Sequence, residues 1–90
     1  MKPRITINLD AQGSLEIWLN ESGRDLLIRE LENLSPKNDH FHIGPAGSRE
    51  LEVSSRAYRA DDKLIEYGKV LFRTDEWDEQ YYPHVMIDVN

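Results

Sequence analysis

The chain has 90 residues, no cysteine and a net charge of −6, from 17 acidic and 11 basic side chains. Its length predicts one domain, residues 1–90, and the lack of cysteine excludes disulfides and thiolate zinc sites. No apolar run approaches the roughly 18–20 residues that span a bilayer, and residues 1–4 lead into a strand pattern without an apolar signal region. We therefore expect a cytoplasmic protein with no membrane partner. Because its negative surface repels phosphate, we also expect no nucleic-acid partner.

In five stretches apolar and polar residues alternate, so the apolar residues occupy every second position. The apolar members are Ile5, Ile7 and Leu9; Leu15, Ile17 and Leu19; Phe41 and Ile43; Leu51 and Val53; and Val85, Ile87 and Val89. Successive side chains of a strand point to opposite faces, so each stretch predicts a strand with one buried face. Val70 and Phe72 favour a sixth strand from about 68 to 74, and we expect 60–67 to be a loop or short helix.

One stretch follows the helical period instead. Leu27, Leu31 and Leu34 lie at i, i+4 and i+7, which is typical of an amphipathic helix. Asn20 or Ser22 is a suitable N-cap. The pattern predicts a helix over about residues 21–34.

Together these elements predict an α+β fold, an antiparallel sheet of five or six strands with the helix on its apolar face. Short turn-rich connections predict hairpins between 5–9 and 15–19 and between 40–43 and 50–54. The residues between the apolar ones point to the opposite, uncovered face, and they include Trp18, His40, His42 and His84. That open face is a candidate binding surface.

Residues 74–83 hold four acids and three large aromatics: Asp75, Glu76, Asp78 and Glu79 with Trp77, Tyr81 and Tyr82. Aromatic side chains anchor protein interfaces, and acids steer a basic partner toward them. The alternative is that the aromatics pack at the edge of the core while the acids stay solvated. We take Asp75, Glu76, Trp77, Asp78, Tyr81 and Tyr82 as candidate partner-binding residues, together with Trp18, His40 and His42.

The histidines suggest a second possibility. His40 and His42 share a face on a strand, and with His84 and a nearby carboxylate they are potential zinc ligands. Exposed or hydrogen-bonded histidines on the wet side of a sheet are the simpler interpretation, so we expect no metal and no other cofactor. No nucleophile elbow, phosphate-binding glycine loop or His-Glu-x-x-His helix is present, so we do not expect an enzyme.

The region from 15 to 54 resembles the immunity protein 32 family of bacterial polymorphic toxin systems. The resemblance lies in the Asn20-x-x-Gly23 helix entry, the His40-x-His42 strand and the Glu50-Leu51-Glu52-Val53 stretch, and it extends to Pro83-His84-Val85-Met86-Ile87. Residues 55–82 are longer than the family pattern. The resemblance implies a bacterial, non-catalytic α+β protein that binds and neutralises a cognate protein toxin by occlusion, as a monomer or homodimer.

Acidity suits a toxin that acts on nucleic acid, because the active site of such a toxin is basic. Two other classes stay open: a small metal- or ligand-binding module that uses the surface histidines, and a homo-oligomeric structural or regulatory domain that buries its open face in a second copy.

Overall fold

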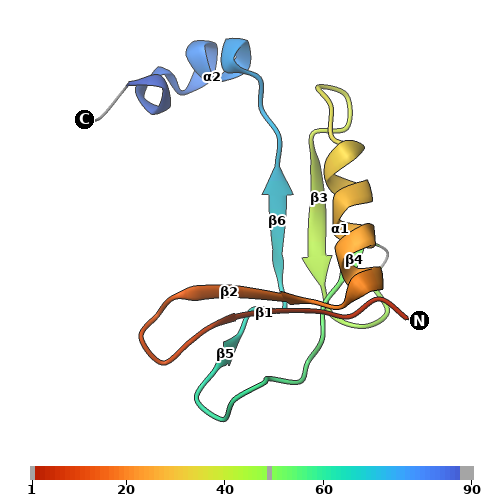
Figure 1. Cartoon of the computed structure of the whole chain (residues 1–90). Coiled ribbons are helices and arrows are strands. Elements are labelled where there is room, and N and C mark those ends of the chain that lie inside the picture. Colours follow the sequence, from red (N-terminus) through yellow and green to blue (C-terminus); the bar gives the residue numbers. More distant parts are fainter. Residues whose placement is uncertain (1, 49, 88–90) are drawn as a thin grey trace.

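The computed structural model describes residues 2–48 and 50–87 (Figure 1). The elements run in the order β1 (Ile5–Leu9), β2 (Leu15–Leu19), α1 (Glu21–Glu32), β3 (His40–Gly44), β4 (Leu51–Glu52), β5 (Lys63–Leu64), β6 (Gly68–Leu71), α2 (Asp75–Tyr81) and a 3-10 helix, η1 (Pro83–Met86). The α+β class is confirmed. None of the helices in these ranges is long and apolar enough to cross a membrane.

The strands form two sheets of three strands each, in the orders β2-β1-β5 and β4-β3-β6. A single sheet of five or six strands is therefore not confirmed. The β1–β2 hairpin has the expected antiparallel register, with Ile7 opposite Ile17. The second expected hairpin is wrong: β4 runs parallel to β3 over a pair only two residues long, and the antiparallel neighbour of β3 is β6.

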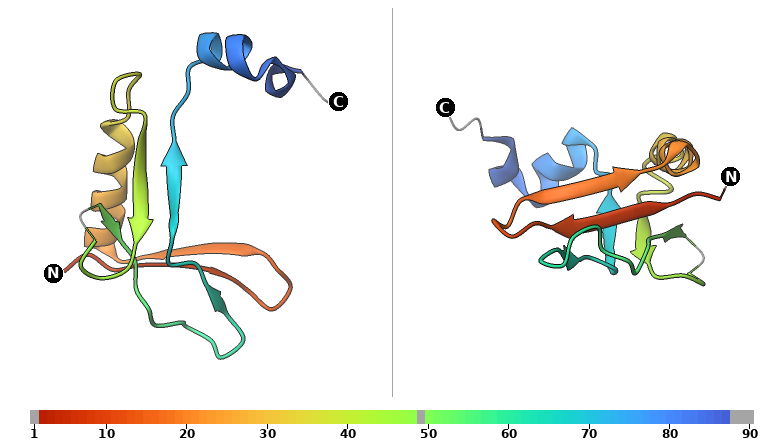
Figure 2. Two further views of the ribbon diagram at one scale, coloured as in Figure 1. Left: turned by 180° about the vertical axis from the view of Figure 1, so that it is seen from behind. Right: turned by 60° about the horizontal axis from the view of Figure 1, so that its bottom comes forward.

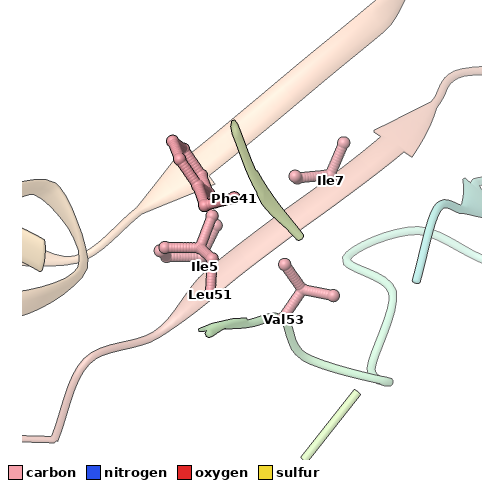
Figure 3. Close-up of a cluster of buried hydrophobic side chains, with 5 residues drawn as sticks. All are labelled: Ile5, Ile7, Phe41, Leu51 and Val53. Atoms are coloured by element: carbon pink, nitrogen blue, oxygen red, sulfur yellow. The ribbon is translucent and has the colours of Figure 1, made fainter. Parts of the chain in front are cut away.

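Five buried apolar side chains form the core at the junction of the two sheets. Figure 3 shows Ile5 and Ile7 of β1 near Phe41, Leu51 and Val53. Partly buried side chains from α1, β3, β6 and the end of β5 pack around them. Residues from both sheets thus share one core, although their strands are not hydrogen-bonded into one layer.

The expected buried face of β2 is wrong. Leu15, Ile17 and Leu19 are 61%, 51% and 40% exposed, although Ile17 and Leu19 lie opposite the buried Ile7 and Ile5 in the hairpin register. The reason is position: the second sheet crosses over β1 and leaves β2 at the outer edge of its own sheet. The row of apolar side chains on β2 therefore lies beyond the core.

The expected last strand is also wrong where the structure describes it. Pro83–Met86 is a 3-10 helix, and Val85 and Ile87 are exposed. Proline suits the first position of a helical turn, because its missing N–H would be unpaired there in any case. Residues 88 and 89 of that expected strand lie outside the described residues.

Helix α1 begins as expected and ends slightly earlier, at Glu32. The Asn20 side chain caps it by accepting a hydrogen bond from the backbone N–H of Gly23 at 2.7 Å. The same oxygen also accepts from the backbone N–H of Arg4 at 2.9 Å, which joins the helix start to the chain that enters β1. Gly23 is buried against the chain entering β1, so a Cβ built there would lie 2.4 Å from the Arg4 carbonyl oxygen. The glycine allows helix and strand to approach closely.

The molecule is extended. Its radius of gyration is 15.4 Å, whereas a compact domain of this length has about 12 Å. Figures 1 and 2 show why: the strands of the two sheets run in different directions, and the chain after β6 leads away from both sheets. We call residues 74–87, which include α2 and η1, the arm.

We predict that Gly23→Ala destabilises the protein by about 1–3 kcal/mol. In an exposed helix the same change stabilises by about 1 kcal/mol, but here the added methyl group clashes with the Arg4 carbonyl. Urea denaturation measures the effect. Gly68→Ala is the control, since its new Cβ meets only Ile43 Cδ1 at an ordinary 3.9 Å. Equal effects at both positions would contradict this account of Gly23.

Candidate interaction surface

Trp18 does not lie on an open face, so this part of the expected surface is wrong. Its indole stacks on Tyr58, with ring centroids 4.0 Å apart and planes 13° apart. Its Nε1–H donates to Asn8 Oδ1 at 2.8 Å. The segment after β4 folds back over this side of the hairpin and covers it.

Charged groups hold that cover in place. Asn8, which is fully buried, donates from Nδ2 to Glu16 Oε1 at 3.0 Å. Arg59 bonds the same Glu16 carboxylate and also Asp62, and its guanidinium lies 5.3 Å from the centroid of Trp18. The hydrogen bond with Asp62 is the main cause that raises the pKa of Arg59. This cluster braces the hairpin, and with the stacked Tyr58 it leaves Trp18 partly buried.

His40 and His42 do lie on an exposed face, the outer side of the β4-β3-β6 sheet. Their rings are 5.0 Å apart and nearly perpendicular. His40 Nδ1 lies 2.8 Å from Asp39 Oδ1, and His42 Nδ1 lies 2.5 Å from Glu50 Oε2. Both imidazoles are thus oriented by a carboxylate while their outer edges face solvent.

Both carboxylates respond to these contacts. The hydrogen bond with His40 lowers the pKa of Asp39, and Arg73 lowers it further. For Glu50, desolvation acts in the opposite direction, but hydrogen bonds from the backbone N–H and the ring of His42 outweigh it and lower the pKa. The two acids are therefore ionised at neutral pH.

The arm carries the expected acidic and aromatic side chains on α2. Thr74 caps the helix by accepting from the Trp77 N–H at 3.1 Å, and Asp75, Glu76 and Asp78 lie in its first turn. Trp77 packs on Tyr81 and Tyr82, with ring centroids 4.8 and 5.4 Å away. Both tyrosines are exposed, and so are three apolar side chains that follow them: Val85, Met86 and Ile87.

A short chain of contacts joins the arm to the histidines. The Arg73 guanidinium lies 4.7 Å from the centroid of the Trp77 ring. Its Nη1 also bonds Asp39 Oδ2 at 3.1 Å, and Asp39 in turn holds His40. The histidine face and the base of the arm therefore form one connected surface. Sequence reasoning missed Arg73, because nothing local shows that residue 73 lies beside residue 39.

The structure does not support a three-histidine metal site. His84 lies on η1, where its ring is 6.0 Å from Tyr82, and not on the strand that carries the other two histidines. Among residues 2–48 and 50–87, no group of three or more histidine, aspartate and glutamate side chains is arranged to hold a metal ion.

No family model, curated protein or solved structure matches this chain.

We predict that Glu50→Gln lowers the melting temperature at pH 7, because the neutral amide replaces a carboxylate that accepts hydrogen bonds from the backbone N–H and the ring of His42. A carboxylate with a lowered folded pKa stabilises above its ordinary pKa of about 4.3 and loses that effect as pH falls through the lowered value. The difference between variant and wild type should thus shrink as the pH approaches 3. Circular dichroism melts from pH 7 downward measure it.

Glu66→Gln is the matched control, since Glu66 has no hydrogen-bond or ion-pair partner among the described residues. A difference in melting temperature between Glu50→Gln and wild type that is as large at pH 3 as at pH 7 would contradict the hydrogen bonds assigned to the Glu50 carboxylate.

Proposed function

We propose that this chain is a non-catalytic binding protein, an immunity-type inhibitor that occludes a cognate bacterial toxin in the cytoplasm. The observation that carries the proposal is the arm: an acidic, aromatic helix held away from the body. Helix α2 packs on η1 and on no other described helix or strand to a comparable extent. A segment that exposes Tyr81, Tyr82 and Val85 without using them in its own core is available to a partner.

The charge of the arm indicates the kind of partner. Four acids lie within Asp75–Glu79, and the arm has no lysine or arginine. Acids around exposed tyrosines accelerate association with a basic protein, while the aromatic rings supply most of the binding energy. His40 and His42 extend the contact surface from the base of the arm. The resemblance to the immunity protein 32 family supports a toxin as that partner.

Genomic context tests the class of partner directly. We expect the gene immediately upstream to encode a large secreted protein that ends in a toxin domain, and co-expression of this chain to restore growth of cells that produce that domain. A metabolic operon around the gene, or no protection by the wild-type chain, would contradict the proposal.

We predict that Tyr81→Ala with Tyr82→Ala weakens toxin binding at least tenfold, because exposed aromatic anchors dominate interface energies. Calorimetry with the purified toxin domain measures the loss. Tyr67→Ala is the matched control, since Tyr67 is 76% exposed but lies on the body. Equal losses from the body variant and the arm variant would exclude the arm as the contact.

We also predict that Asp75→Asn with Glu76→Gln slows toxin association several-fold at low salt and that the difference narrows at high salt. Long-range attraction between exposed charges is screened beyond about 8 Å at physiological ionic strength, and steering acts on the association rate. Stopped-flow mixing measures the rate. Asp61→Asn with Glu66→Gln removes the same charge from the body and should leave the rate nearly unchanged.

A further inference from the structure

The outer strand of the first sheet, β2, is an unprotected edge. Natural edge strands are usually protected by lysine, proline, a bulge or a covering segment. The sequence of β2, Leu-Glu-Ile-Trp-Leu, contains neither lysine nor proline, and its register with β1 contains no bulge. The edges of the other sheet differ, because β4 is only two residues long and β6 begins with Gly68 and Lys69.

The hydrogen bonds at both ends of the hairpin show which backbone groups of β2 point outward. The N–H of Asp10 donates to the Ser14 carbonyl at 2.9 Å, and the N–H of Asn20 donates to the Arg4 carbonyl at 3.1 Å. Hydrogen-bonded and non-hydrogen-bonded pairs alternate along an antiparallel ladder. Residues 14, 16, 18 and 20 therefore bond to β1, while the N–H and C=O groups of Leu15, Ile17 and Leu19 point away from it.

The same three residues form the exposed apolar row described above. Within residues 2–48 and 50–87, no strand pairs with these outward backbone groups, and the three side chains stay exposed. Such a strand can extend its sheet by pairing with another strand and cover its side chains in the same step.

We propose that the occupant is a second copy of this chain, with β2 paired antiparallel to β2 about a two-fold axis at Ile17. In this register Ile17 faces Ile17 of the second copy, and Leu15 faces Leu19. Every outward N–H and C=O of these residues then has a partner, and the apolar side chains of both rows become neighbours on one face. This face is not the histidine face, so the dimer is independent of the proposed toxin contact.

The charges on the opposite face suit this pairing. Glu16 comes to lie opposite Trp18 of the second copy, and in each copy Arg59 lies over Trp18. Each Glu16 carboxylate thus lies near its own Arg59 and near that of the second copy. No like charges face each other directly, whereas a strand protected against pairing would oppose them.

The molecule exposes more surface than a compact chain of its size. The accessible surface is 7087 Å², while a compact monomer of 10.5 kDa exposes about 5,400 Å². Leu15, Ile17 and Leu19 of β2, which are 61%, 51% and 40% exposed, contribute to this excess. Pairing through β2 also closes the assembly, because the other edge, β5, is only two residues long.

Light scattering over a concentration series tests the dimer. We expect the wild-type mass to rise toward twice that of one chain, and Ile17→Lys to stay monomeric because two ammonium groups would meet at the axis. Leu71→Lys is the matched control, since Leu71 is 53% exposed on β6, and it should dimerise like the wild type. A monomeric wild type at all concentrations, or a dimer that Ile17→Lys leaves intact, would overturn the proposal.

Cross-linking tests the register without disturbing the fold. The chain has no cysteine, so Ile17→Cys introduces a single thiol. Directly opposed residues of a hydrogen-bonded pair have Cα atoms about 5.5 Å apart, within the range that a disulfide spans. Mild oxidation should give a covalent dimer for Ile17→Cys much faster than for Leu15→Cys or Leu71→Cys. Equal rates for all three variants would exclude an axis at Ile17.

Discussion

Burial of β1 on both of its faces is the constraint on which the rest of the structure depends. Ile5 and Ile7 face the core on one side, and Thr6 and Asn8 are equally buried on the other. The first side is covered by the second sheet, and the second side is bordered by the segment after β4, whose backbone bonds to β1 at Ser54 and Ile65. A strand covered on both sides must pair on both edges, which explains β5 even though its sequence has no strand pattern.

This arrangement explains which parts of the fold the sequence could predict. Alternation along 5–9 and 15–19 depends on local geometry, so the sequence predicts both strands and their antiparallel hairpin correctly, and the period of about 3.6 locates α1. Alternation does not show which face another segment will cover. Asn8 and Trp18 lie on the face of the hairpin that the pattern predicts to be exposed to solvent. That face is covered by Tyr58 and Arg59, which are forty or more residues away in the sequence. Leu15 and Ile17 are apolar, but no segment reaches them.

The same difference between local signals and distant contacts explains which parts of the candidate surface the sequence could predict. His40 and His42 lie on a strand whose exposed face follows from Phe41 being buried between them, which is a local signal. The helix in the arm also had a local signal that was not used: Thr74 followed by Asp75 and Glu76 is typical of an N-cap and an acidic first turn. Pro83 suits the entry to an edge strand, but it suits the start of a helical turn equally well. The contact between Arg73 and Asp39 could not be predicted, because it depends on the pairing of β3 with β6.

Because the core is small, the two proposed contacts would also affect the stability of the folded chain. The described residues include five buried apolar side chains, which is few for a chain of 90 residues, and chains of this size bury only about two thirds of their unfolded surface even when compact. The extended shape reduces that fraction further, so any partner that binds the folded form stabilises it by mass action. Pairing at β2 would extend the sheet that contains β1. It would therefore stabilise the sheet whose central strand contributes Ile5 and Ile7 to the core. The arm leaves the other sheet at the end of β6, so both arms of a dimer would stay accessible. In this arrangement one surface supports the fold and the other is free to bind a partner.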